Sequence, residues 1–324
     1  TGLDVAGSRA KVFFTPVIDA EHLFKLYRRV NEGIYGRTAI KLHTGEKHGP
    51  NILPRDLVRD FQSRIPNSNI VETNTLYEGD RYTTEGHRET LKVNGWTFCP
   101  VDIMDEDGTA MLPVKDGKWF TEMSVGKNLL NYDSLLLLTH FKGHVMGGFG
   151  GSNKNIGIGC ADGRVGKAMI HTVEGSDHMW SIATEELMER ITESTKSVVD
   201  HFGDHIAFVN VMRNMSVSCD CEGVAAEPVV TPDVGIVASA DILAADQACV
   251  DMVFAMKEDE HKALTERMLT RHSMRQLSYM KEMGMGNNRY RLIDLDNDDE
   301  VIDAAKAVEG VVPFGQVRKI KYSK

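Results

Sequence analysis

Residues 134–166 read SLLLLTHFKGHVMGGFGGSNKNIGIGCADGRVG, and this stretch decides the fold. Four consecutive leucines at 135–138 are typical of a strand that is buried on both faces of a sheet. The next 27 residues, 140–166, contain nine glycines interleaved with histidine, lysine, asparagine and cysteine. Glycine lets the backbone approach a ligand closely, and ligands of open α/β sheets bind beyond the carboxyl ends of the strands. The stretch therefore predicts a buried strand that runs into a ligand-binding loop.

On both sides of this strand, the sequence alternates between strand and helix patterns. Residues 20–30 carry apolar side chains at the i, i+3, i+4, i+7 spacing of an amphipathic helix. Repeated strand–helix–strand units predict an α/β fold, with one or more mostly parallel sheets and helices on both faces. An antiparallel excursion is expected at 105–125. Further helices are expected at 54–65, 84–94, 184–202 and 242–256, and one long charged helix at 258–283.

The length of 324 residues exceeds the usual ~100–200 residues of one domain. We therefore expect two lobes. The first is an N-terminal α/β lobe, residues 1–133. The second is a C-terminal α/β lobe, residues 134–324, which carries the Gly-rich loop at the strand ends between the two lobes.

Composition excludes several classes of protein. Lys and Arg number 37 against 47 Asp and Glu, a net charge of −10, and no basic run indicates a nucleic-acid partner. No apolar run approaches the roughly 18 residues that a membrane span needs. Five cysteines are too few for a disulfide scaffold, and their odd number argues the same way. Residues 1–10 lack the pattern of a signal peptide, so the protein is expected in the reducing cytoplasm.

Three of the cysteines predict a metal site. Cys219 and Cys221 flank Asp220 in a turn after a strand, and Cys160 closes the Gly-rich loop. Cysteine thiolates are the usual ligands of iron–sulfur clusters and common ligands of zinc. The fourth ligand is left open between a histidine, a water and a substrate atom, and a redox pair is the alternative for the Cys219–Cys221 turn. Cys249, on a predicted helix, is expected to pack in the core.

The Gly-rich loop supplies the candidates for chemistry and ligand binding. Lys154, His144 and His140 are predicted to act as acid, base or anion anchor. The loop is neither a Walker loop nor a strict GxGxxG fingerprint. Asp246 lies among alanines inside a predicted helix, where an unpaired carboxylate is costly, so we expect it to meet a cation, Lys154 or Lys167. The predicted cofactor-binding residues are Gly147, Gly148, Gly150, Gly151, Asn155 and Asp246.

Together, the Gly-rich motif at 147–160, the Cys219-Asp220-Cys221 turn and residues 232–249 resemble the DUF362 family, often labelled as iron–sulfur centre proteins. The resemblance spans nearly the whole chain and implies an iron–sulfur cluster. The ferredoxin module that many members carry, with its CxxCxxC runs, is absent from this sequence.

A more distant similarity is to the nickel-pincer lactate racemase family, in which a histidine precedes a Gly-rich segment and a lysine. His144 and Lys154 match that pattern, ten residues apart, and His171 falls near a later histidine. In that family the lysine carries the cofactor and a histidine binds nickel.

Three hypotheses follow for the function. The first is an iron–sulfur or other thiolate-metal enzyme, an oxidoreductase, lyase or isomerase, that acts on a small polar substrate and works with a redox partner protein. The second is a metal- or cofactor-binding module without turnover, with zinc or nickel as alternative metals. The third is a pincer-cofactor racemase or epimerase that uses Lys154. The exposed face of 258–283 offers a surface for a homo-oligomer.

Overall fold

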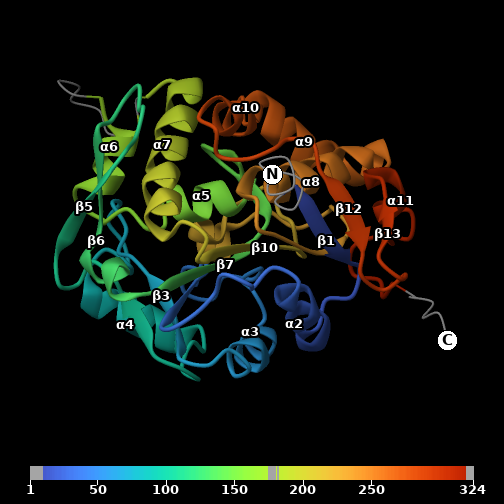
Figure 1. The fold of residues 1–324 in the computed structure, drawn as a ribbon, viewed down its shortest axis with the longest axis horizontal. Helices are drawn as coiled ribbons and strands as arrows, with labels where there is room; N and C mark the ends of the chain where they lie inside the picture. The colour runs from blue at the N-terminus through green and yellow to red at the C-terminus, as the bar shows by residue number, and fades with distance from the viewer. Residues whose placement is uncertain (1–9, 174–179, 181, 319–324) are drawn as a thin grey trace.

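The computed structural model describes residues 10–173, 180 and 182–318, and this part of the chain forms one nine-stranded sheet. The strand order is β13-β12-β1-β11-β10-β7-β2-β3-β4 (Figure 1). Five neighbouring pairs are parallel and three are antiparallel. The strands are β1 (Lys11–Thr15), β2 (Thr38–Lys41), β3 (Ser68–Glu72), β4 (Val101–Ile103), β7 (Ser134–His140), β10 (Ile206–Met212), β11 (Gly235–Ser239), β12 (Arg291–Asp294) and β13 (Glu300–Ile302).

Helices cover both faces of this sheet, as predicted (Figure 1). One face carries α2 (Ala20–Arg28), α3 (Arg55–Gln62) and α4 (Thr84–Val93). The other face carries α5 (Ser152–Gly157), α6 (Gly166–His171), α7 (Thr184–Phe202), α8 (Ile242–Ala255), α9 (Glu258–Thr270) and α10 (Met274–Glu282), and α11 (Ala304–Val308) packs against α8.

The leucines of β7 show how the sequence specifies these two layers. Leu135 and Leu137 belong to the core under α7 and α8, while Leu136 and Leu138 belong to the core under α2 and α3. Successive side chains of a strand point to opposite faces, so a run of four leucines fills both cores at once. The prediction of a strand buried on both faces is confirmed.

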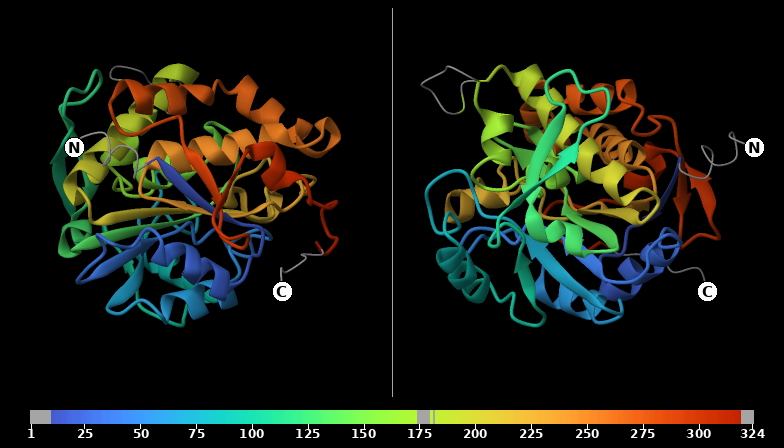
Figure 2. Two further views of the ribbon diagram at one scale, coloured as in Figure 1. Left: turned by 45° about the vertical axis from the view of Figure 1, so that its right-hand side comes forward. Right: turned by 60° about the vertical axis from the view of Figure 1, so that its left-hand side comes forward.

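Two small hairpins complete the fold. The antiparallel excursion is the hairpin of β5 (Thr109–Pro113) and β6 (Glu122–Gly126), which lies beside α7 (Figure 2) and leads into the short 3₁₀ helix η1 (Lys127–Asn131). The first part of the Gly-rich segment folds into the hairpin of β8 (Lys142–His144) and β9 (Gly148–Gly150), directly before α5. The Gly-rich segment therefore continues from the carboxyl end of β7 and forms a hairpin outside the nine-stranded sheet.

Both ranges expected as lobes, 1–133 and 134–324, contribute strands to the same sheet. The strand β1, from the first range, lies between β11 and β12 of the second. The division into two lobes stays a prediction. Within the described residues, no helix is long and apolar enough to cross a bilayer.

The prediction of one long helix at 258–283 is wrong. The segment forms α9 and α10, separated by a turn in which His272 has a φ of 55°. Tertiary packing explains the break, because a Cβ at Gly148 would lie 2.5 Å from the Cβ of Ser273. The hydroxyl of Ser273 donates to the carbonyl oxygen of Met268 at 2.7 Å. The helix therefore turns where the Gly-rich hairpin passes it.

Candidate functional site

Three parallel strands end at one cavity of about 300 Å³. Lys41 at the end of β2, Glu72 at the end of β3 and His140 at the end of β7 all line it. A ligand site beyond the carboxyl ends of strands is the usual place in an open α/β sheet. The remaining charged and polar lining comes from His43, Thr73, Thr75, Tyr77, Arg81, Thr139, Lys142, His144, Lys154, Asn155, Lys167, His171, Cys219 and Cys221.

The Cys219-Asp220-Cys221 turn brings two thiols to this cavity. It follows β10 and opens the short 3₁₀ helix η2 (Asp220–Ala225), with Cys219 as its N-cap. The backbone N–H of Cys221 donates to the Sγ of Cys219 at 3.4 Å. Both Sγ atoms and one ring nitrogen of His144 lie within 4.8 Å of one another. The two sulfurs are thus close enough to bind one metal ion, with the ring of His144 beside them.

The two thiols differ in protonation. Burial alone would raise the pKa of Cys219, but the hydrogen bond from Cys221 and the charge of Lys154 bring it well below its usual value. The pKa of Cys221 is raised well above its usual value by its hydrogen bond to Cys219 and by burial. Of the two thiols, Cys219 therefore loses its proton more readily, and the thiolate is the nucleophilic and metal-binding form.

Two histidines present N–H groups to these sulfurs. The Nδ1 of His144 accepts two backbone N–H groups, at 3.1 and 2.9 Å, and the Nδ1 of His43 accepts one at 3.0 Å. Each neutral ring therefore carries its proton on Nε2. The Nε2 of His43 lies 3.6 Å from the Sγ of Cys219, and that of His144 lies 3.9 Å from the Sγ of Cys221. Burial lowers the pKa of His144 to about 4, so the ring is neutral near pH 7.

Lys154 extends from α5 into the cavity as a buried amine. Its Nζ makes no hydrogen bond to any residue that the structure describes. Burial lowers its pKa, while the sulfurs of Cys219 and Cys221 oppose that effect. Cβ atoms at Gly147 and Gly150 would lie 3.3 and 3.7 Å from the Cδ of Lys154, so these two glycines leave room for its side chain.

Asp246 supports the helix that carries Lys154. The expectation that it meets Lys154 or Lys167 is wrong, because its oxygens accept from the backbone N–H groups of Ser152 and Asn153 at 2.8 and 3.0 Å. The Nδ2 of Asn210 adds a third hydrogen bond at 2.9 Å. Peptide dipoles replace the expected cation, and burial raises the pKa of Asp246 to about 6. At Gly151 a Cβ would lie 2.5 Å from an Asp246 oxygen. The absence of a side chain at Gly151 therefore leaves room for this carboxylate.

His140 is tied to the cysteine turn. Its Nδ1 lies 2.7 Å from an Asp220 oxygen, and its Nε2 lies 2.7 Å from the carbonyl oxygen of Arg213. Both contacts are to acceptors, so the ring fills both only when each nitrogen carries a proton. The Nζ of Lys142 lies 3.7 Å from the same Asp220 carboxylate. His140 thus positions the residue between the two cysteines.

The structure does not bring Cys160 into the group of Cys219, Cys221 and His144. Its side chain is fully buried in the larger hydrophobic core, and burial raises its pKa to about 11. Cys249 also lies in that core, as predicted. Asn155 lines the cavity and accepts a hydrogen bond from the Nζ of Lys41 at 2.9 Å.

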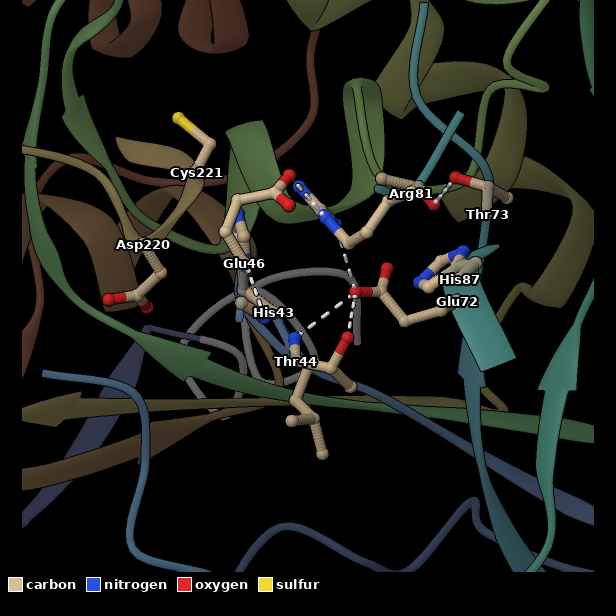
Figure 3. A network of polar contacts seen from close by, with 12 residues as sticks. His43, Thr44, Glu46, Glu72, Thr73, Arg81, His87, Asp220 and Cys221 are labelled. Atoms are coloured by element: carbon tan, nitrogen blue, oxygen red, sulfur yellow. Dashed lines mark hydrogen bonds and ion pairs between the residues drawn. The ribbon is translucent and has the colours of Figure 1, made fainter. Parts of the chain in front are cut away.

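Glu72 organises a second network on the cavity wall (Figure 3). Its carboxylate lies 3.1 Å from the Nζ of Lys41 and 3.6 Å from Arg81, and it accepts from the hydroxyl and backbone N–H of Thr44 at 2.6 and 3.1 Å. Burial would raise the pKa of Glu72, but the two cations hold it well below its usual value. The sequence analysis missed Lys41 and Glu72. A lysine inside an apolar buried strand was the available signal, because lysine is almost never fully buried unpaired.

Two solved structures are similar to this chain at low identity. The lactate racemase apoprotein from Thermoanaerobacterium thermosaccharolyticum shares 11% identity with a TM-score of 0.40, covering 76% of this chain and 58% of its own. A protein from Thermotoga maritima shares 13% identity with a TM-score of 0.36, covering 61% of this chain and 51% of its own. This chain thus spans little more than half of either neighbour.

No curated protein matches the sequence. The model of a domain of unknown function, DUF362, matches residues 38–251, which run from β2 through most of α8 and include the whole cysteine turn and Gly-rich segment. The match covers more than half of the chain, and the chain therefore belongs to the DUF362 family.

Proposed function

We propose that the protein is an enzyme that binds a soft metal ion through Cys219 and Cys221 and acts on a small polar substrate in the adjoining cavity. The observation that carries the proposal is the placement of two cysteine sulfurs and a lysine amine without a described hydrogen-bond partner in one cavity. Structural sites are usually fully coordinated, whereas catalytic sites keep a position open. Two cysteine ligands beside a cavity leave such a position.

The donor set favours a single ion over an iron–sulfur cluster. Clusters are usually held by four cysteine thiolates, and this cavity offers the two sulfurs of Cys219 and Cys221. Cys160, the third thiol expected from the sequence, is held protonated in the core. Zinc and nickel both accept thiolate ligands. A bound ion of this kind would supply Lewis-acid polarisation of a substrate oxygen.

The chain's own side chains are the candidates for proton transfer, for charge stabilisation and for holding the cysteine turn. Lys154 is the candidate base or nucleophile, because burial lowers its pKa and its Nζ makes no hydrogen bond to any described residue. His144 is the candidate hydrogen-bond donor to developing negative charge, since its Nε2 carries the proton. His140 and Asp220 hold the cysteine turn in place. Because five buried cationic side chains and four histidines line the cavity, a polar substrate finds hydrogen-bond and charge partners there.

Metal analysis of anaerobically purified protein tests this proposal. We expect about one equivalent of zinc, nickel or iron in the wild type, its loss in Cys219→Ser and in Cys221→Ser, and its retention in the matched control Cys249→Ser. A broad absorption near ~400 nm with iron and acid-labile sulfide would replace the single ion by a cluster. Full metal retention in both turn variants would refute the assignment of the ligands. Metal without conversion of any substrate would leave a binding module.

A second function is favoured by Lys154 alone. A buried amine without a hydrogen-bond partner suits covalent attachment of an organic cofactor, as in a pincer-cofactor racemase or epimerase. Intact-mass measurement of protein from its native source would then show an adduct, and peptide mapping would place it on Lys154. An unmodified mass together with bound metal would leave the first proposal alone.

A further inference from the structure

Lys167 is a buried cation on the cavity wall that makes no ion pair with any described carboxylate. It extends from α6, and its Nζ donates to the hydroxyl of Thr73 at 2.5 Å and to the carbonyl oxygen of Ala161 at 2.7 Å. An ammonium has three N–H donors, so one donor remains after these two bonds. No acidic side chain among the described residues comes within 4.0 Å of this nitrogen.

The other cations of the cavity place Lys167 in context. Five cationic side chains line the space, and three of them contact carboxylates: Lys41 with Glu72, Arg81 with Glu46 and Glu72, and Lys142 with Asp220. Lys154 faces the sulfurs of the cysteine turn. Only Lys167 among these five has neither a carboxylate nor a thiolate as its partner in the described part of the chain. Asp105 and Glu72 act on Lys167 only from beyond 4.0 Å, so its ammonium has no directly paired anion among the residues that the structure describes.

A purely structural role does not account for this charge. Bridging Thr73 and Ala161 requires only a neutral donor, whereas burying an ammonium without a paired counter-ion is unfavourable. The cost is visible in the pKa of Lys167, which burial and the charges of Lys41 and Arg81 lower to about 8 against the opposing effect of Asp105 and Glu72. A bound anion would remove that cost.

The rest of the lining indicates what kind of anion fits. Leu76, Val145, Met146, Ile158 and Trp180 line the same cavity with apolar surface. The ring of Trp180 packs edge-on against His171 at 4.7 Å, and the Nδ1 of His171 bonds the carbonyl oxygen of Lys167 at 2.8 Å. Apolar side chains and the Lys167 ammonium therefore line the same cavity. A volume of about 300 Å³ is at the small end for ligand pockets.

We infer that Lys167 binds the carboxylate of the substrate, and that the substrate is a small organic acid with an apolar body. This inference rests on the proposed function, because it names the substrate class of the same cavity. Inorganic anions such as phosphate would use the ammonium but leave the apolar wall unfilled. Neutral molecules of the same shape would leave the buried ammonium unpaired.

Calorimetric titration with benzoate and benzamide tests the inference on wild-type protein. These two probes share a ring and differ in charge, so we expect benzoate to bind at least tenfold more tightly than benzamide and more tightly than phosphate. In Lys167→Met, benzoate affinity should fall at least tenfold while benzamide affinity stays the same. The control Lys92→Met, at an exposed position on α4, should bind both probes as the wild type does.

Stability separates this role from a structural one. If Lys167 acts as an anion anchor, Lys167→Met without ligand should melt no lower than the wild type, because an unpaired buried charge has been removed. Equal binding of benzoate and benzamide, tighter binding of phosphate, or unchanged benzoate affinity in Lys167→Met would overturn the inference.

Metal content of the same samples separates the two proposals. Full metal with no preference for benzoate refutes only the role of Lys167. Benzoate binding that depends on Lys167, in protein that never holds metal at Cys219 and Cys221, supports the anchor and refutes only the metal site.

Discussion

Removing the negative charge of Glu72 should be among the most destabilising conservative changes in this protein. Glu72, Lys41 and Arg81 are 3%, 2% and 5% exposed, so solvent screens their interactions little. Glu72→Gln keeps an oxygen for Thr44 but leaves two buried cations without their shared carboxylate. Breaking a buried ion pair by removing one partner costs about 3–5 kcal/mol. For a chain of 324 residues, that corresponds to a fall in melting temperature of roughly 4–7 °C.

Urea unfolding at pH 7, followed by circular dichroism, measures this cost directly. The matched control is Glu106→Gln, which removes a partly exposed carboxylate paired with Arg88 and should cost less than about 1 kcal/mol. The pKa of Glu72 is depressed in the folded state, so its contribution is complete above the unfolded value of ~4.3 and is lost as the pH falls through the folded pKa. A loss below 1 kcal/mol at pH 7, or a difference between variant and wild type that does not shrink as the pH falls below ~4.3, would refute the reasoning.

Three further predictions concern the turn, a hairpin and a helix cap. In metal-free protein, iodoacetamide at pH 7 should alkylate Cys219 many times faster than Cys160, whose pKa is about 11, and peptide mass spectrometry would show the order. Gly148→Ala should destabilise far more than Gly284→Ala: both glycines have positive φ, but the new methyl would meet a neighbouring side-chain carbon at 2.5 Å in the first and open space in the second. Thermal melts of the pair measure the difference, and equal shifts would count against the close approach. Asp241→Ala, which removes the N-cap of α8, should cost about 1–2 kcal/mol in urea unfolding.

Local patterns in the sequence predict the elements of this fold well. The predicted helix at 184–202 coincides with α7, and the leucines of β7 specify its burial on both faces. These features depend on side chains close together in the sequence. The order of strands depends instead on contacts between distant segments, which is why no local pattern places β1 between β11 and β12.

The break at His272 has a similar cause. Residues 258–283 contain neither glycine nor proline, so the pattern favours one helix. The turn arises where Ser273 packs against Gly148, more than a hundred residues earlier in the chain. Tertiary packing overrides local helix propensity at such positions.

The kinds of side chain at the candidate site could be predicted from the sequence, but which particular residues reach the cavity could be predicted only in part. The sequence indicated the cysteine turn, Lys154 and His144, because glycines and reactive side chains cluster around a strand end. It could not separate Cys160 from Cys219, since both follow predicted loops and only the three-dimensional packing buries the first in the core. The sequence favours a cation beside Asp246, because a buried carboxylate needs a partner. Its actual partners, the backbone N–H groups of Ser152 and Asn153, belong to another helix, and no local pattern reveals them.

The position of β1 has a consequence for how the chain folds during synthesis. Its partners in the sheet are β11 and β12, and β11 begins at Gly235, 220 positions after Thr15. At about 5–20 residues per second, the ribosome needs roughly 11–44 s to make the intervening chain. Throughout that interval Val12 and Phe14, which end in the core, lack the two strands that flank β1. The nascent protein therefore carries an exposed apolar strand until late in translation, and its yield should depend on chaperones that bind such segments.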